Sequence, residues 1–284
     1  MKLICLALIP MLLNACLCDW LTADLTFSIA APIASAGATF TGTNTSSSSL
    51  HTTLRFSGDL TEANTATFAS EARFRVDGTH EYQVTTATSF TGTTSVNSVT
   101  QGVYWAPQTQ GAVTVETFEQ TDDGNDDVAD ASWSNVDFEL EGTPVVIDIG
   151  DLNLAMDFVF DTEGSEISDS EIAAYNLDGT LIAEDDDAGS GSLSRLDLGS
   201  LSAGTYYIVA GDFDLTFANF QATTNGTDTG DLALNLNGEN VHIEELSSGE
   251  IVVVRFNVVA VPEPTSTAFF MIVSFSLLLV RTRA

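Results

Sequence analysis

Two aspartate-rich segments contain the residues best suited to bind a metal ion. The first choice is a run of three carboxylates in a loop flanked by glycine and serine, formed by Asp185, Asp186 and Asp187. The second choice is a cluster within residues 121–130, formed by Asp122, Asp123, Asp126 and Asp127. Calcium is the candidate cofactor, because it takes six to eight oxygen ligands in irregular geometry.

These segments leave two questions open. Three consecutive side chains of an extended loop cannot all point the same way, so we expect one of the three aspartates at 185–187 to face away. The cluster at 121–130 lacks the spacing of an EF-hand and its closing glutamate, and its alternative interpretation is a solvated linker between domains.

Signatures of catalysis are absent from the sequence. The three histidines, His51, His80 and His242, lie in separate strand-like segments without metal-binding spacing, and we interpret them as surface residues of strands. No Gly-x-Ser-x-Gly motif, phosphate-binding loop or nucleophilic cysteine downstream of the leader occurs. The chain is therefore predicted not to be an enzyme, with an uncharacterised hydrolase as a minor alternative.

The composition excludes several partners. The chain has 40 Asp and Glu against 8 Lys and Arg, so its surface repels nucleic acid and favours cations. Its three cysteines, Cys5, Cys16 and Cys18, all precede residue 19, so a processed protein has neither disulfides nor cysteine-based metal sites. Stability must come from packed sheets.

The elements that position these residues are predicted to be strands. Apolar and polar residues alternate through most of residues 37–259, and no segment keeps a helical apolar period over three turns. Asp77-Gly78 between two alternating runs predicts a tight hairpin. The predicted fold is all-β, with two jelly-roll-like β-sandwich domains at residues 37–127 and 128–259 and a boundary between Thr121 and Ser132.

Residues 170–213 carry a more specific pattern. A strand and turn through Ala174-Tyr175-Asn176-Leu177-Asp178-Gly179 precede the loop Asp185-Asp186-Asp187-Ala188-Gly189, then Ser194-Arg195-Leu196 and Ala203-Gly204-Thr205-Tyr206-Tyr207. This pattern resembles the bacterial pre-peptidase C-terminal β-sandwich. The resemblance implies an accessory, adhesion or targeting unit, and some relatives bind calcium or polymeric substrates.

The N-terminus reads as a secretory signal peptide. Lys2 precedes an apolar run from Leu3 to Leu13, and Ala34 and Ala36 form a small-residue cleavage pattern that predicts a leader at residues 1–36. The competing interpretation is a lipoprotein-like site at which Cys16 is acylated.

The C-terminal segment at 260–284 contains Pro262, Glu263 and Pro264, an apolar run from Ala268 to Val280, and then Arg281 and Arg283. As a helix that run spans about 20 Å, short of the roughly 30 Å hydrocarbon core, and the arginines mark its cytoplasmic end. We expect a single short transmembrane helix. The order of motif, span and basic stop resembles the PEP-CTERM sorting tail, which implies cleavage by the membrane protease exosortase. The alternative is a plain tail anchor.

Together these features predict a non-catalytic exported bacterial protein. We expect it to pass transiently through the inner membrane, where an exosortase-like protease processes it, and to reach the cell surface or extracellular matrix, where extracellular polysaccharide is a candidate partner. The alternative function is a calcium- or carbohydrate-binding adhesion module, which would need Trp105 or Trp133 exposed beside an acidic loop.

Overall fold

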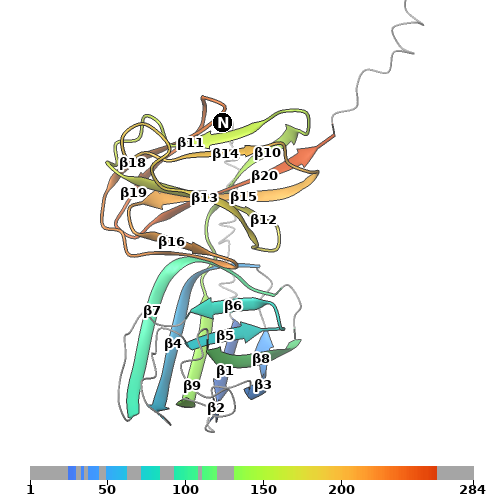
Figure 1. The fold of residues 1–284 in the computed structure, drawn as a ribbon, viewed down its shortest axis with the longest axis vertical. Helices are drawn as coiled ribbons and strands as arrows, with labels where there is room; N and C mark the ends of the chain where they lie inside the picture. The colour runs from blue at the N-terminus through green and yellow to red at the C-terminus, as the bar shows by residue number, and fades with distance from the viewer. Residues whose placement is uncertain are drawn as a thin grey trace, which may run out of the picture.

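The computed structural model describes residues 25–29, 33–34, 38–44, 49–62, 72–83, 93–107, 111–119 and 131–260. Every regular element within these ranges is a β-strand (Figure 1), so the predicted all-β fold is confirmed for them. The strands form one large sheet, built mostly from the first half of the chain, and two smaller sheets from the second half.

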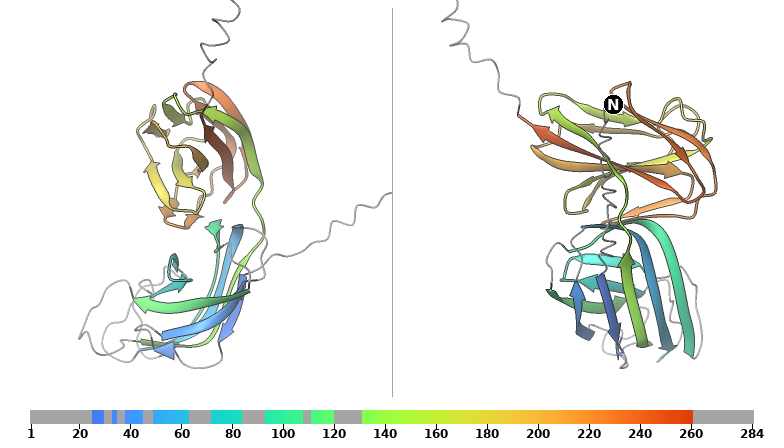
Figure 2. Two further views of the ribbon diagram at one scale, coloured as in Figure 1. Left: turned by 90° about the vertical axis from the view of Figure 1, so that its right-hand side faces the viewer. Right: turned by 180° about the vertical axis from the view of Figure 1, so that it is seen from behind.

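The large sheet has eleven strands. They are β1 (Leu25–Ile29), β2 (Ile33–Ala34), β3 (Ala38–Asn44), β4 (Leu50–Glu62), β5 (Ala72–Val76), β6 (His80–Gln83), β7 (Thr93–Trp105), β8 (Gly111–Glu119), β9 (Ala131–Glu141), β16 (Leu215–Ala218) and β17 (Gln221–Thr224). The order is β16-β17-β7-β4-β9-β1-β3-β8-β5-β6, and β2 pairs with β9. The sheet curves over itself (Figure 2), so that Phe56 of β4 and Phe138 of β9 share one buried cluster with Phe74 of β5.

The predicted hairpin at Asp77-Gly78 is confirmed. β5 and β6 pair across it, and Thr79 donates its N–H to the carbonyl of Val76 at 3.2 Å. Asp77 and Gly78 both have positive φ values, 50° and 71°, at the centre of the turn that connects the twisted strands.

The boundary between the two predicted domains lies elsewhere in the structure. β9 pairs with β4 and β1, and its buried residues, among them Trp133 and Phe138, belong to the core of the large sheet. The change from one core to the next therefore follows Glu141 instead of falling between Thr121 and Ser132. β8 and β9 flank residues 120–130 and belong to the same sheet, so this segment connects two strands of one body.

The first two strands, β1 and β2, lie within the predicted leader at residues 1–36. β1 lies between β9 and β3, with Phe27 opposite Phe138, and β2 pairs with β9 through Ile33 and Ala34. Cleavage after Ala36 would remove both strands and open the sheet between β9 and β3, whereas processing before Cys16 would retain them.

The second half contains two sheets. One has the order β10-β20-β15-β12-β13 and the other the order β14-β11-β18-β19. Their bounds are β10 (Val146–Asn153), β11 (Phe158–Asp161), β12 (Ser170–Asn176), β13 (Leu181–Asp185), β14 (Arg195–Gly199), β15 (Gly204–Asp212), β18 (Gly230–Leu236), β19 (Glu239–Leu246) and β20 (Ile251–Val259). Both sheets contribute to one buried cluster, in which Phe158 and Phe160 of β11 contact Phe256 of β20. The strands expected at 172–175, 181–183, 194–198 and 205–211 correspond to β12, β13, β14 and β15.

The two halves also meet each other. β17 pairs with β7, with Ala222 opposite Val103, although in the sequence β17 lies between β15 and β18, two strands of the second core. Trp105 stacks on Tyr175 with ring centroids 4.4 Å apart, and both rings belong to a third buried cluster shared by the two halves.

The two chain ends lie largely outside the described residues. The predicted residues outside the described ranges are Cys16 and Ala36 near the N-terminus and all of residues 261–284 at the C-terminus. The internal cluster of Asp122, Asp123, Asp126 and Asp127 also lies outside them. Among the residues that the structure does describe, no helix has the length and hydropathy needed to cross a membrane.

Candidate calcium site

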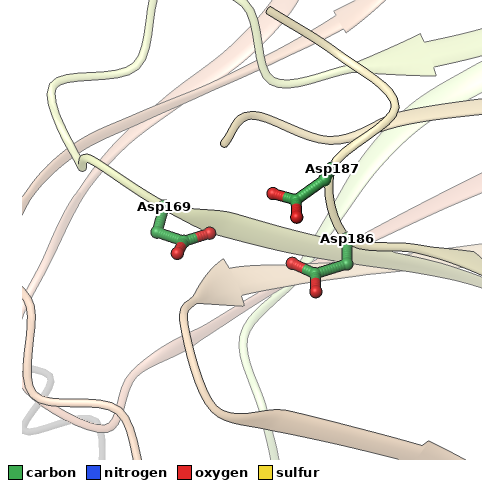
Figure 3. Close-up of side chains that lie close together, drawn as sticks. All are labelled: Asp169, Asp186 and Asp187. Atoms are coloured by element: carbon green, nitrogen blue, oxygen red, sulfur yellow. The ribbon is translucent and has the colours of Figure 1, made fainter. Parts of the chain in front are cut away.

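Three aspartates from two separate segments come together at one end of the β12–β13 hairpin. Asp169 immediately precedes β12, and Asp186 and Asp187 immediately follow β13. Each offers a carboxylate oxygen within 4.8 Å of the others, and the three side chains face a common space (Figure 3). This constellation contains two of the three aspartates chosen from the sequence, together with Asp169, which sequence reasoning missed.

The loop after β13 folds back onto the start of β12 and so creates this constellation. Asp169 and Ser192 form an isolated parallel bridge, and Ser170 donates its N–H to the carbonyl of Ser192 at 3.1 Å. Within the loop, the N–H of Gly189 bonds to the carbonyl of Leu193 at 2.7 Å. A Cβ at position 189 would lie 2.3 Å from that same oxygen, so this close approach requires glycine.

Buried hydroxyl groups anchor the loop. The Ser194 N–H lies 2.9 Å from Thr162 Oγ1 and 3.1 Å from Ser170 Oγ, and it donates to both. The Ser194 hydroxyl donates to the carbonyl of Asp186 at 2.8 Å, and Ser194 has no exposed surface. The backbone of Asp186 is therefore held from the protein interior.

Asp185 has a different role from its two neighbours. Its Oδ2 accepts the N–H of Ala188 at 3.1 Å and the N–H of Arg195 at 2.7 Å. The side chain closes the loop between β13 and β14 and stands outside the constellation, in agreement with the expectation that one of three consecutive carboxylates faces away.

Glu171 adds a buried carboxylate beside the three aspartates. It is 7 % exposed, and its Oε2 has no hydrogen-bond partner. It lines the same hollow as Asp186 and Asp187, and it also accepts the backbone N–H of Leu215. Burial, followed by the negative charge of Asp186, raises the pKa of Glu171 to about 7.

The group carries strong uncompensated negative charge. Burial raises the pKa of Asp169, and the charges of Asp186, Asp187 and Asp228 raise it further. Burial and the charges of Asp187 and Asp185 likewise raise the pKa of Asp186. Within the described part of the chain, no arginine or histidine forms an ion pair with any of the three aspartates. Several carboxylate oxygens, of which Asp169 Oδ1 and Glu171 Oε2 are buried without a hydrogen-bond partner, fit calcium better than a softer metal.

Other predicted functional residues do not join this site. Trp105 and Trp133 are each 1 % exposed, so neither offers the exposed ring that the carbohydrate alternative required. His51 is fully buried in β4 instead of lying on the surface. The ring of His80 packs against that of Phe220 at a tilt of 35°, and His242 pairs with Glu244 at 2.9 Å.

The residues that sequence reasoning missed lie at strand ends. Asp169 and Glu171 alternate with serine immediately before and within β12, and Asp212 and Asp214 flank Phe213 at the end of β15. Alternating acids at the edge of a predicted strand would have been a usable signal, because β12 and β15 pair directly.

Comparisons with protein-family models, with curated proteins and with solved structures found no match to this chain. The assignment of calcium therefore rests on the oxygen ligands, their burial and their charge.

Proposed function

We propose that this chain is a non-catalytic exported protein of the bacterial surface or extracellular matrix, and that its folded body binds calcium at Asp169, Asp186 and Asp187. The observation that carries the proposal is the convergence of these carboxylates beside the buried Glu171, one of whose two carboxylate oxygens has no hydrogen-bond partner. Calcium would neutralise charges that otherwise repel one another, and extracellular fluids supply it at the millimolar concentrations that weak sites require.

The remaining parts of the proposal draw on the sequence. The apolar N-terminus supports export, and the order of Pro262, Glu263 and Pro264 before a short span and arginines supports sorting by an exosortase-like protease. Two sheets enclosing one core support the likeness of the second half to the pre-peptidase C-terminal β-sandwich. A role as a structural or targeting unit follows from this combination.

Calcium binding is tested by thermal unfolding of the full chain. Ligand at about 100 times its Kd stabilises the native state by about 2.7 kcal/mol. For a chain of this size that corresponds to an increase in Tm of about 5–10 °C over the value in EDTA. The double variant Asp186→Asn, Asp187→Asn should lose most of this increase.

The matched control is Asp157→Asn with Glu239→Gln, which removes two exposed charges outside the cluster. The control should keep the calcium response of the wild type. If millimolar calcium leaves the wild-type Tm at its EDTA value, the three aspartates form only a solvated acidic surface.

A further inference from the structure

A second acidic hollow lies next to the candidate calcium site. It has a volume of about 170 Å³, and four of its eight lining residues are aspartates, namely Asp169, Asp212, Asp214 and Asp228. None of the eight is basic. Asp169 contributes to both the hollow and the first site, so the two share a border.

Asp212 is the buried residue of this hollow. It ends β15, opposite Ser170 of β12, and is 1 % exposed. Its Oδ2 accepts the N–H of Asp228 at 2.8 Å, whereas its Oδ1 has no hydrogen-bond partner. Within the described residues, only three carboxylates have a buried oxygen without a partner, and they are Asp169, Glu171 and Asp212. A carboxylate in this position requires a proton or a cation to be stable.

Gly226 shapes the space around that carboxylate. A Cβ at position 226 would lie 2.0 Å from Asp212 Oδ1 and 2.3 Å from its Cγ, so only glycine leaves room for the carboxylate. Hydrogen bonds hold the backbone of Gly226, since its N–H donates to Thr224 Oγ1 at 3.0 Å and its carbonyl accepts the Ser248 hydroxyl at 3.3 Å. Gly226 therefore packs directly against the carboxylate of Asp212, and a larger residue at this position would displace it.

The surrounding charges are all negative. Burial raises the pKa of Asp212, and the charges of Asp228 and Asp214 raise it further, while the N–H of Asp228 opposes them. Asp228 is exposed, and its Oδ2 accepts the Ser168 hydroxyl at 3.2 Å. A divalent cation would satisfy the orphaned oxygen and also reduce this repulsion.

We propose that this hollow binds a second divalent cation, with Asp212 and Asp228 as its carboxylate ligands and water completing the shell. The ligands are all oxygens, so a hard divalent cation is expected, and calcium is the ion used to test the site. The proposal uses different carboxylates from the first site, so either site can fail without the other.

The experiment is calorimetric titration of the full chain with calcium chloride. We expect the wild type to bind two equivalents, Asp212→Asn to bind one, and Asp186→Asn with Asp187→Asn also to bind one. Asparagine keeps the acceptor for the Asp228 N–H, and Asp228→Asn provides a second, surface-exposed variant if Asp212→Asn does not fold. Asp157→Asn should retain both equivalents.

Three outcomes distinguish the sites. In one outcome the wild type binds a single calcium ion, Asp212→Asn does not bind it, and the variant with Asp186→Asn and Asp187→Asn still does. This outcome would support the second site and contradict the first. Binding of one equivalent that survives both Asp212→Asn and Asp228→Asn would overturn the second site and indicate that Asp212 holds a proton. Loss of all binding in the Asp186 and Asp187 variant alone would also overturn the second site as an independent one.

Discussion

Glu171 is a carboxylate that the fold buries next to other carboxylates, although burial and nearby negative charge both disfavour its ionised form. Pairing of β12 with β15 on one side and β13 on the other buries its side chain, yet its carboxylate faces Asp186 and Asp169. The N–H of Leu215 satisfies only part of its hydrogen-bonding capacity. Such a group is tolerated when a ligand compensates for it, as a bound cation would do here.

This conflict predicts a pH-dependent stability in the absence of calcium. The pKa of Glu171 rises from 4.5 to about 7 on folding, so the folded state binds the proton more tightly than the unfolded state does. The stabilising contribution is fully present below the unfolded pKa of 4.5 and is lost as the pH rises through about 7. In EDTA, the free energy of unfolding should fall over this range, and Glu171→Gln should reduce that fall.

Urea unfolding at several pH values measures the effect as the difference between wild type and Glu171→Gln. Glu239→Gln, which changes an exposed glutamate on β19, controls for the loss of one charge. Parallel pH profiles for wild type and Glu171→Gln would contradict the prediction.

At the scale of elements, the β12–β13 hairpin connects the acidic site to the interface between the two halves. Its open end carries Asp169 and Asp186, and its turn contains Gly179. The turn is fixed from both sides, because the N–H of Gly179 bonds to the carbonyl of Asn176 at 3.1 Å and its carbonyl accepts the N–H of Phe220 at 2.7 Å. Asp178 Oδ1 accepts the N–H of Thr180 at 3.0 Å, a usual interaction of aspartate in turns.

Gly179→Ala is therefore expected to destabilise the protein. Gly179 has a φ of +89°, and a Cβ there would lie 2.4 Å from Trp105 Cγ, so the variant suffers both backbone strain and overlap with a buried ring. Gly78→Ala is the matched control, because Gly78 has a φ of +71° but no atom within 4 Å of the added Cβ. Gly179→Ala should lower the free energy of unfolding by about 1–3 kcal/mol more than Gly78→Ala does, as measured by urea unfolding. Equal losses in the two variants would show that the turn does not pack on Trp105.

At the scale of the whole molecule, the chain combines a β-rich body with a formal net charge of −32. The buried cluster around Trp105, Tyr175 and Tyr207 joins the two halves, while β17 continues the large sheet beyond β7. Such a charge keeps the body soluble and favours association with cations. In the function proposed above, export and sorting would depend on the termini.

The proposed sorting tail leads to a prediction about release from the membrane. Proline fixes φ and disfavours helix in the residue before it, so Pro262 and Pro264 would keep the backbone extended at the membrane surface, where a protease cleft can accept it. Replacement of Pro262, Glu263 and Pro264 by alanine should leave export intact and block release, with full-length protein accumulating in the inner membrane. Cell fractionation compares this variant with the wild type, and equal release of both forms would identify the tail as an ordinary anchor.

The sequence by itself determined the local features of this protein. Alternation placed the strands of the 170–213 segment, and the Asp77-Gly78 and Asp178-Gly179 turns were recognisable because turn geometry depends on a few adjacent residues. The aspartates at 186 and 187 were also recognisable, since they adjoin each other in a glycine-flanked loop.

Only the tertiary structure decided which distant segments meet. Alternation shows that one face of a strand is buried but not which sheet buries it, so it did not place β9 in the first core or Trp105 and Trp133 out of solvent. Asp169 lies seventeen positions before Asp186, and it reaches the site only because the loop after β13 bonds back to the start of β12. Those hydrogen bonds join backbone groups, which every residue carries, and the side-chain pattern therefore does not encode them.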